Sequence, residues 1–235
     1  MRSTDTSIET TFSILFAISI AHLLNDAVQS VIPSIYPILK DDFGLTFIQI
    51  GIITFVFQMT SSILQPFVGR YADRHPSPFA LTFGMCISLA GLVMLAFSDS
   101  FHFIIASVAV VGIGSSIFHP EASRVAQNAA GYRKGLAQSI FQVGGNGGTA
   151  IGPLLAAMIV LPHGKGAVIW FALALVLGAI VTTWIGRWYR RYVATRMASQ
   201  AAKVIRSIHL TERQIRRAMT VLVLLTFSKQ FFLSD

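Results

Sequence analysis

Long apolar blocks separated by short polar connections are the feature that most constrains how this chain folds. A helix that crosses the hydrocarbon core of a bilayer needs about 20 mostly apolar residues. Seven blocks reach or approach that length, at residues 12–39, 46–68, 79–97, 102–124, 136–160, 167–186 and 218–235. Only 12% of the residues are charged, about half the fraction usual in a globular protein. The sequence therefore predicts an all-α membrane protein with the lipid bilayer as its solvent.

The distribution of basic residues explains the formal net charge of +8. With a cytoplasmic N-terminus, fifteen of the eighteen Lys and Arg fall in cytoplasmic loops and helix ends. Only Lys40 and Lys165 fall outside, and Lys229 lies within the last block. Because membrane proteins concentrate Lys and Arg on the cytoplasmic side, we predict a multi-pass protein of the inner (plasma) membrane with a cytoplasmic N-terminus. The charge then requires no nucleic-acid partner.

The order of the blocks predicts three parts. Residues 1–186 hold six blocks and are expected to form an N-terminal six-helix transmembrane bundle. Residues 187–217, with nine Lys or Arg, are expected to be a basic cytoplasmic linker, either a helix on the anionic leaflet or a solvated segment. The 18 residues 218–235 are expected to be a truncated seventh transmembrane helix. This is the layout of a two-halved transporter cut after its first half, so the expected partner is a missing C-terminal half.

Asp26 is a carboxylate halfway along the first block. A charge near the bilayer centre costs about 2.5–3.5 kcal/mol on insertion scales and is a functional hypothesis by default. The spacing i, i+3, i+4 and i+7 places it on one helical face with three other polar residues, His22, Asn25 and Gln29. We predict that this face borders a polar cavity, with His22 and Asp26 coupling protons and Asn25 and Gln29 contacting substrate. A hydrogen-bonded patch between helices is the alternative.

The fourth block ends in a second polar group around Pro120. His119 and Glu121 are further proton-coupling candidates, and Arg124 is a substrate-cavity candidate. Glu121 and Arg124 lie three residues apart and can pair on one face. A structural ion pair between them is an equally open hypothesis.

The fifth block carries amides at i, i+4 and i+8, which again predict a polar face: Gln138, Gln142 and Asn146. Gln142 and Asn146 are the remaining substrate-cavity candidates. Cys86 is the only cysteine, which excludes a cysteine metal cluster and an intrachain disulfide. We expect neither a metal nor a cofactor.

A short segment after the second block resembles the signature loop of the major facilitator superfamily. It reads Gly69-Arg-Tyr-Ala-Asp73-Arg74, and we expect it to be a cytoplasmic turn. In that superfamily the aspartate corresponding to Asp73 docks against the second half of the transporter.

A second motif, Gly148-x-x-x-Gly152-Pro153 in the fifth block, resembles the antiporter motif of the superfamily. Its glycines permit close backbone contact with a neighbouring helix, and the proline predicts a bend. Three further stretches narrow the resemblance to the bacterial fosmidomycin resistance family: His22-Leu-Leu-Asn25-Asp26, Ser116-Ile-Phe-His119-Pro120-Glu121-Ala-Ser-Arg124 and Gln138-Ser-Ile-Phe-Gln142-Val-Gly-Gly-Asn146.

This resemblance implies a twelve-helix fold of two six-helix halves around a cavity near the membrane midplane. It also implies proton-coupled efflux (drug/proton antiport) of a small anionic antibiotic such as fosmidomycin. Under this hypothesis the substrates are a small molecule and protons, and half a transporter alone is expected not to transport.

Two other functions stay open from the residues. One is a major facilitator uptake symporter for another small metabolite, because composition does not separate import from export. The other is a membrane-embedded serine enzyme, suggested by Gly114-Ser115-Ser116. Such an enzyme needs a histidine on a later helix to activate the serine, whereas His119 lies on the same helix. We therefore predict that the chain is not an enzyme.

Overall fold

The computed structural model describes residues 10–200, 213, 216–217 and 219–221, with side chains between 10 and 195 in the long described stretch. By their contacts the residues divide into two units, Met1–Ala194 and Thr195–Asp235, and the helical bundle below belongs to the first. Apart from 219–221, the predicted seventh helix lies outside the described residues, as does most of the predicted linker beyond residue 200.

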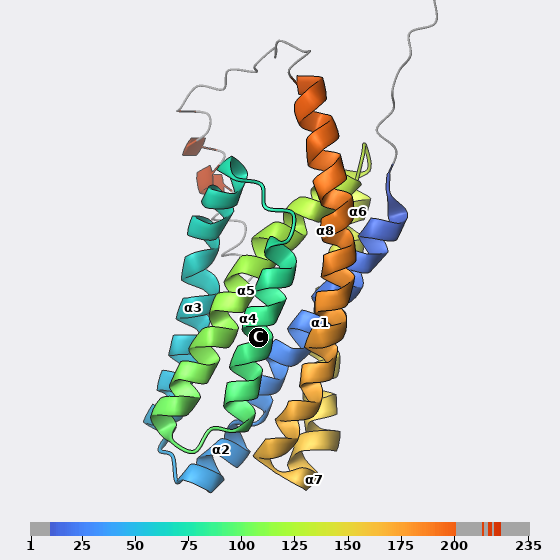
Figure 1. Cartoon of the computed structure of the whole chain (residues 1–235). Coiled ribbons are helices and arrows are strands. Elements are labelled where there is room, and N and C mark those ends of the chain that lie inside the picture. The colour runs from blue at the N-terminus through green and yellow to red at the C-terminus, as the bar shows by residue number, and fades with distance from the viewer. Residues whose placement is uncertain (1–9, 201–212, 214–215, 218, 222–235) are drawn as a thin grey trace, which may run out of the picture. The chain divides into compact units, whose positions relative to one another are not determined.

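The long helices α1, α3, α4, α5, α6 and α8 run alternately in opposite directions (Figure 1). In chain order they are α1 (Phe12–Ser34), α2 (Tyr36–Phe43), α3 (Phe47–Arg74), α4 (Ala80–Ala96), α5 (Phe101–Ala129), α6 (Lys134–Leu155), the π-helix η1 (Ala156–Val160), α7 (Leu161–His163), the 3₁₀ helix η2 (Lys165–Phe171) and α8 (Ala172–Gln200).

Five helical runs among the described residues are long and apolar enough to cross a bilayer: Phe12–Ser34, Phe47–Arg74, Phe101–Ala129, Lys134–His163 and Lys165–Thr195. Helix α4 is also apolar but has 17 residues. The described part of the chain contains no strand, so the predicted all-α membrane architecture is confirmed.

The first predicted block is divided in two by the structure. Helix α1 ends at Ser34 and α2 begins at Tyr36, with Ile35 between them. Pro33 and Pro37 flank this break, and neither has a backbone N–H to continue the helical hydrogen bonds. The prediction of one segment over 12–39 was therefore wrong in this respect.

The predicted turn at Gly69–Arg74 is helical. Helix α3 starts at a capping box in which Thr46 and Gln49 exchange hydrogen bonds, and it continues to Arg74. It stops at His75 because the next residue, Pro76, disfavours the helical conformation of the residue before it. The turn itself is therefore the segment 75–79.

Helices α1 and α5 form the inside of the bundle. About half of the residues in the apolar windows of α1 and α5 are buried, 56% and 50%, against 17% for α3. Helices α3 and α4 both pack on α5, and α6 packs along α1. Polar residues on α1, α5 and α6 consequently face one another inside the bundle.

Small residues let α6 approach α1 closely. A Cβ at Gly144 would lie 2.7 Å from Oγ of Ser19, and one at Gly148 would lie 2.9 Å from the backbone nitrogen of Ala27. These separations are shorter than real Cβ contacts allow, so larger residues here would force the helices apart. Beyond Pro153, α6 continues into the π-helix η1. Such widened turns are typical where the regular helical ladder is interrupted.

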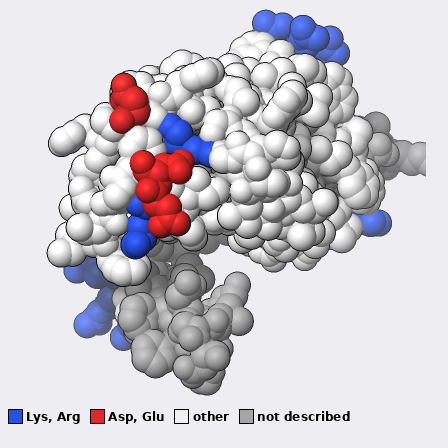
Figure 2. Space-filling model, turned by 90° about the horizontal axis from the view of Figure 1, so that it is seen from below, with Lys and Arg blue, Asp and Glu red and all other residues white. Residues whose placement is uncertain are grey.

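The two ends of the bundle differ in charge. Helices α3 and α5 end and α6 begins at one end of the bundle (Figure 1). These parts of the chain carry Arg70, Arg74, Arg124, Arg133 and Lys134, so we call it the basic end. Figure 2 shows the opposite end, where a few acidic and basic side chains gather on a largely uncharged face. There Lys165 of η2 donates to the carbonyl and hydroxyl oxygens of Ser98 and lies 4.9 Å from the ring centroid of Phe43. Lys165 thereby links η2 to α2 and to the segment between α4 and α5.

Candidate functional site

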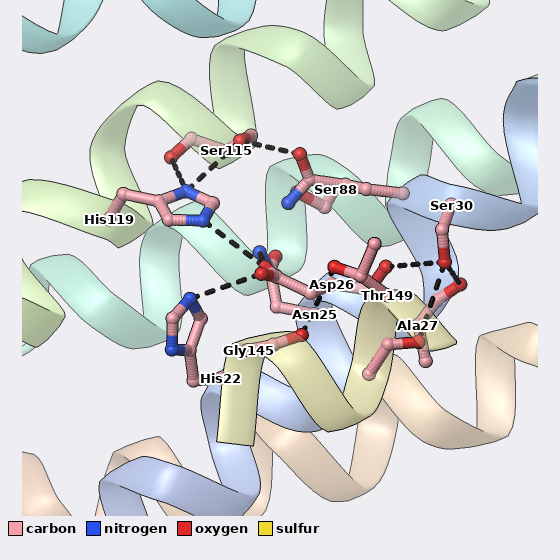
Figure 3. Close-up of polar contacts among 12 residues, drawn as sticks. His22, Asn25, Asp26, Ala27, Ser30, Ser88, Ser115, His119, Gly145 and Thr149 are labelled. Atoms are coloured by element: carbon pink, nitrogen blue, oxygen red, sulfur yellow. Dashed lines mark hydrogen bonds and ion pairs between the residues drawn. The ribbon is translucent and has the colours of Figure 1, made fainter. Parts of the chain in front are cut away.

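Asp26 lies between two imidazoles inside the bundle (Figure 3). Its Oδ2 is 3.1 Å from Nε2 of His22, one turn earlier on α1, and its Oδ1 is 3.2 Å from Nε2 of His119 on α5. Asn25 donates to the same Oδ1 at 3.1 Å. We call His22, Asp26 and His119 the His–Asp–His cluster. Sequence spacing places the first two together, and packing of α5 on α1 adds the third.

The second nitrogen of His22 determines where its proton lies. Nδ1 of His22 is 2.9 Å from the carbonyl oxygen of Phe141, and the two rings stack with centroids 4.0 Å apart. A carbonyl oxygen only accepts, so Nδ1 is the donor. A neutral His22 then has a bare Nε2, which cannot donate to a carboxylate. The contact between His22 and Asp26 is therefore a hydrogen bond only when an additional proton resides on one of them.

The cluster opens onto a polar cavity of about 430 Å³ between α1, α3, α5 and α6. The side chain of Asp26 is 18% exposed and that of His119 25%, against 6% for His22, so His22 lies behind the other two. Most of the lining is polar, and the lining residues are His22, Asp26, Gln65, His119, Pro120, Ser123, Gln138, Phe141, Gln142, Gly145 and Asn146. Molecules in the cavity thus reach the carboxylate directly.

The predicted site residues divide between this cavity and its walls. His22, Asp26, His119, Gln142 and Asn146 line it. Asn25 is 1% exposed and Gln29 accepts a hydrogen bond from the Ser115 hydroxyl at 2.9 Å, so both support the cluster from behind. Neither is a lining residue, although both were expected to contact substrate.

Glu121 and Arg124 form a separate network toward the basic end. Nη1 of Arg124 donates to Glu121 at 2.6 Å, and its Nη2 donates to Asp73 at 2.7 Å and to the carbonyl of Gly69 at 3.0 Å. The Glu121 side chain is 1% exposed, whereas that of Asp73 is 71% exposed. The network joins α5 to the end of α3, and none of these residues lines the polar cavity. Arg74 is exposed at the end of α3.

The motif resembling the antiporter signature lies in the contact between α6 and α1. Gly148 and Gly152 face backbone atoms of Leu23 and Ala27, and Ser30 also contacts Gly152. The motif therefore controls how closely α6 approaches the helix that carries Asp26.

Several site residues were missed from the sequence. Ser115 contacts His119 and Gln29, and its position four residues before His119 was an available signal. Gln65 lines the cavity from α3 and could have been noticed as a polar residue within an apolar block. The carbonyl of Phe141 orients His22, and no sequence pattern indicates such a backbone contact.

Ser115, His119 and Asp26 contact one another in the order found in the catalytic triad of a serine hydrolase. The Ser115 oxygen is 3.2 Å from Nδ1 of His119, and Nε2 of His119 faces Asp26. However, Ser115 is 1% exposed, its hydroxyl donates to Gln29, and it does not line the cavity. This geometry offers a substrate no approach to the hydroxyl.

The same cluster could offer donor atoms to a metal ion, because its three donor atoms lie within 4.8 Å of one another. The separations of 3.1 and 3.2 Å between nitrogen and oxygen are also ordinary for hydrogen bonds. We interpret the cluster as hydrogen-bonded. The absence of a bound metal stays a prediction.

The amino-acid sequence is similar to those of known membrane transporters. The sequence model of the Major Facilitator Superfamily matches residues 18–234. The chain is 50% identical over 230 residues to the Fosmidomycin resistance protein of Escherichia coli (strain K12), covering 98% of this chain and 56% of that protein. It is 48% identical over 194 residues to the uncharacterized MFS-type transporter YfnC of Bacillus subtilis (strain 168), covering 83% of this chain and 46% of that protein. The chain thus spans about half the length of these curated relatives.

Solved structures show the same fold at low identity. A bacterial homologue of the human lysosomal transporter Spinster, inward-facing and unoccupied, matches with a TM-score of 0.66 and 17% identity, covering 75% of this chain and 42% of that one. A variant of the peptide transporter POT matches with a TM-score of 0.64 and 19% identity, covering 94% and 46%. At these identities the similarity supports the fold alone.

Proposed function

The chain belongs to the major facilitator superfamily, and from this premise we propose that it is the N-terminal half of a proton-coupled efflux transporter. The proposed substrate is a small anionic antibiotic such as fosmidomycin, exchanged for protons across the bacterial inner membrane with the basic end cytoplasmic. The observation that carries the proposal is the His–Asp–His cluster, whose contact between His22 and Asp26 requires an additional proton. The name of the relative that is 50% identical supports the choice of drug.

Proton binding at the cluster has a structural consequence. With the additional proton, His22 and Asp26 attract one another and the cluster is closed. Without it, the bare Nε2 of His22 and a carboxylate oxygen 3.1 Å away both present lone pairs, and they repel. His22 also contacts Phe141 on α6, and Asp26 also contacts His119 on α5. Protonation of this pair on α1 therefore favours one arrangement of α1 against α5 and α6. A transporter that alternates between two arrangements of its halves can use such a preference.

The amides of α3 and α6 are the proposed substrate contacts. Gln65, Gln138, Gln142 and Asn146 face the cavity together with Ser123. Their carbonyl and N–H groups can bind the oxygens of a small polar drug while Asp26 exchanges a proton beside it. A second six-helix half is expected to close the other side of the cavity, because substrate sites of this fold lie between halves.

An uptake symporter for a small anion is the second candidate, and one observation favours it. The described lining residues include Asp26 but no Lys or Arg. Protonation therefore makes the cavity less negative and improves the binding of an anion. This thermodynamic linkage would carry proton and anion in the same direction.

A chimaera distinguishes drug efflux from drug uptake and from the absence of transport. In it, this chain replaces the matching part of the E. coli fosmidomycin resistance protein, and host cells lack that protein. We expect cells with the chimaera to accumulate less fosmidomycin and to grow at higher drug concentrations than cells without it. An uncoupler that collapses the proton gradient should remove the difference, whereas a chelator should not. Greater drug accumulation would support uptake, and a membrane-inserted chimaera without any effect would contradict transport of this drug.

Gly145 provides a matched test of the His22 position. A Cβ at Gly145 would lie 2.7 Å from Nε2 of His22, whereas one at Gly147, two residues later, would lie 3.5 Å from its nearest neighbour, Leu23. Overpacking costs about 1–3 kcal/mol, which corresponds to roughly a fivefold to 150-fold effect. We expect Gly145→Ala to slow drug efflux by that factor and Gly147→Ala to leave it unchanged. Equal effects of the two substitutions would show that the position of His22 is unimportant.

A further inference from the structure

The two imidazoles of the His–Asp–His cluster differ in what faces their Nδ1 atoms. Figure 3 shows the contact of His119 with Ser115. Nδ1 of His22 faces the carbonyl of Phe141, which only accepts a hydrogen bond. Nδ1 of His119 faces the carbonyl of Ser115 at 3.0 Å and also the hydroxyl of Ser115 at 3.2 Å. A hydroxyl donates as well as accepts. His22 is therefore restricted to one neutral tautomer, whereas His119 has two.

The Ser115 hydroxyl can donate the hydrogen bond that a neutral His119 accepts at Nδ1. When it donates to Nδ1, the ring gives up the hydrogen bond from Nδ1 to the Ser115 carbonyl. Its only proton is then on Nε2, which donates to the carboxylate of Asp26 at 3.2 Å. His119 keeps its contact with Asp26 without becoming charged. The contact between His22 and Asp26, in contrast, is a hydrogen bond only when the pair holds the additional proton.

The buried amide of Gln29 supports this arrangement. In the orientation that accepts from Ser115, its Nε2 is buried and has no partner among the described residues. Amide oxygen and nitrogen are assigned from the hydrogen-bond network rather than observed. Turning the amide gives Nε2 the Ser115 oxygen as acceptor and frees the hydroxyl hydrogen for His119. It pairs one of the two N–H groups of Nε2 and leaves the carbonyl oxygen of Gln29 without a partner.

We propose that Ser115 is a positioning residue that holds His119 neutral, so that the cluster carries one exchangeable proton, shared between His22 and Asp26. The proton count follows from the contacts. With His22 charged, Asp26 ionised and His119 neutral, both contacts to Asp26 are hydrogen bonds and the net charge is zero. Without the hydroxyl, His119 would need a second proton to keep its contact, and the cluster would carry a net positive charge inside the membrane-spanning bundle. Isolated charges there are costly.

No other titratable group lines the cavity among the described residues. From α3 and α6 the lining groups are amides, an aromatic ring and glycine. The Glu121–Arg124 pair on α5 lies toward the basic end and does not line the cavity. We therefore assign the exchange of one proton to the His–Asp–His cluster. This inference rests on the proposed function of the cluster as a proton site.

Nitrogen NMR of the histidines in the full 235-residue chain, reconstituted in lipid nanodiscs, tests the assignment. Ring nitrogens with and without a proton have well separated shifts, and His22→Gln and His119→Gln identify the two signals. When the cluster loses its additional proton we expect the Nε2 signal of His22 to change, while His119 stays neutral with its proton on Nε2. We expect Ser115→Ala to move the His119 proton to Nδ1 or to make His119 titrate, and Ser115→Thr to restore the original signal.

Ser116→Ala is the matched control. Ser116 is also buried, but its hydroxyl donates to the carbonyl of Ile113 and has no contact with the cluster. It should leave the His119 signal unchanged. If His119 and His22 become charged together in the unmodified chain, or if Ser115→Ala leaves the tautomer unchanged, the role of Ser115 is wrong while the proton site stands. If the Nε2 signal of His22 shows neither the loss of a proton nor the loss of a hydrogen bond over the pH range, the proposed proton site itself fails.

Discussion

Replacing Asp26 by asparagine is expected to abolish the fosmidomycin resistance that the chimaera confers. Asparagine keeps the shape of the side chain but cannot exchange a proton, and its amide cannot serve as the common acceptor for both imidazoles. Drug concentrations that inhibit growth should fall to those of cells without the chimaera. The measurement is the growth inhibition curve together with the amount of protein in the membrane.

Asp41→Asn is the control for the loss of a negative charge. Asp41 is exposed on α2, near the end of the bundle opposite the basic end, and lies outside the cavity lining. We expect it to leave resistance unchanged. Full resistance of the Asp26→Asn chimaera would remove Asp26 from proton coupling.

Replacing Arg124 by alanine is expected to destabilise the bundle more than any other single change in the network at the basic end. The substitution leaves Glu121, whose side chain is 1% exposed, without its cationic partner. Removing one partner of a buried ion pair costs about 3–5 kcal/mol because the other charge is left uncompensated. We expect a corresponding fall in the free energy of unfolding, measured by denaturant titration of the reconstituted chain.

Two further variants separate this explanation from a general effect of mutation. Asp73→Ala removes the other acidic partner of Arg124, but that side chain is 71% exposed. Exposed pairs contribute about 0–1 kcal/mol, so little stability should be lost. In the double variant Glu121→Gln with Arg124→Gln both charges are absent, and much of the stability should return. A loss as large for Asp73→Ala as for Arg124→Ala would contradict burial as the cause.

The sequence predicted the fold well because the bilayer imposes a minimum helix length. Each of the first six apolar blocks corresponds to a described helix or helical run. The ends were less accurate, since hydropathy follows the apolar region whereas helical hydrogen bonds continue into polar surroundings. Thus α3 extends to Arg74 and α8 to Gln200. The break at Ile35 was missed because prolines hardly alter hydropathy.

The site was predictable where one helix supplies it and unpredictable where helices meet. Spacing along α1 placed His22 beside Asp26, and their nitrogen and oxygen atoms are 3.1 Å apart. The contact with His119 depends on the packing of α5 on α1, which a single sequence does not specify. The same holds for Arg124, whose contacts with Gly69 and Asp73 come from α3 and direct its guanidinium away from the cavity.

Drug-driven proton movement measures the central claim directly. Inside-out membrane vesicles carrying the chimaera are acidified by respiration, and a dye reports the internal pH when fosmidomycin is added outside. If drug enters in exchange for protons leaving through the His–Asp–His cluster, the interior becomes less acidic with Asp26 present and stays unchanged with Asp26→Asn. Drug entry without proton movement, or the same proton movement in both chimaeras, would contradict it.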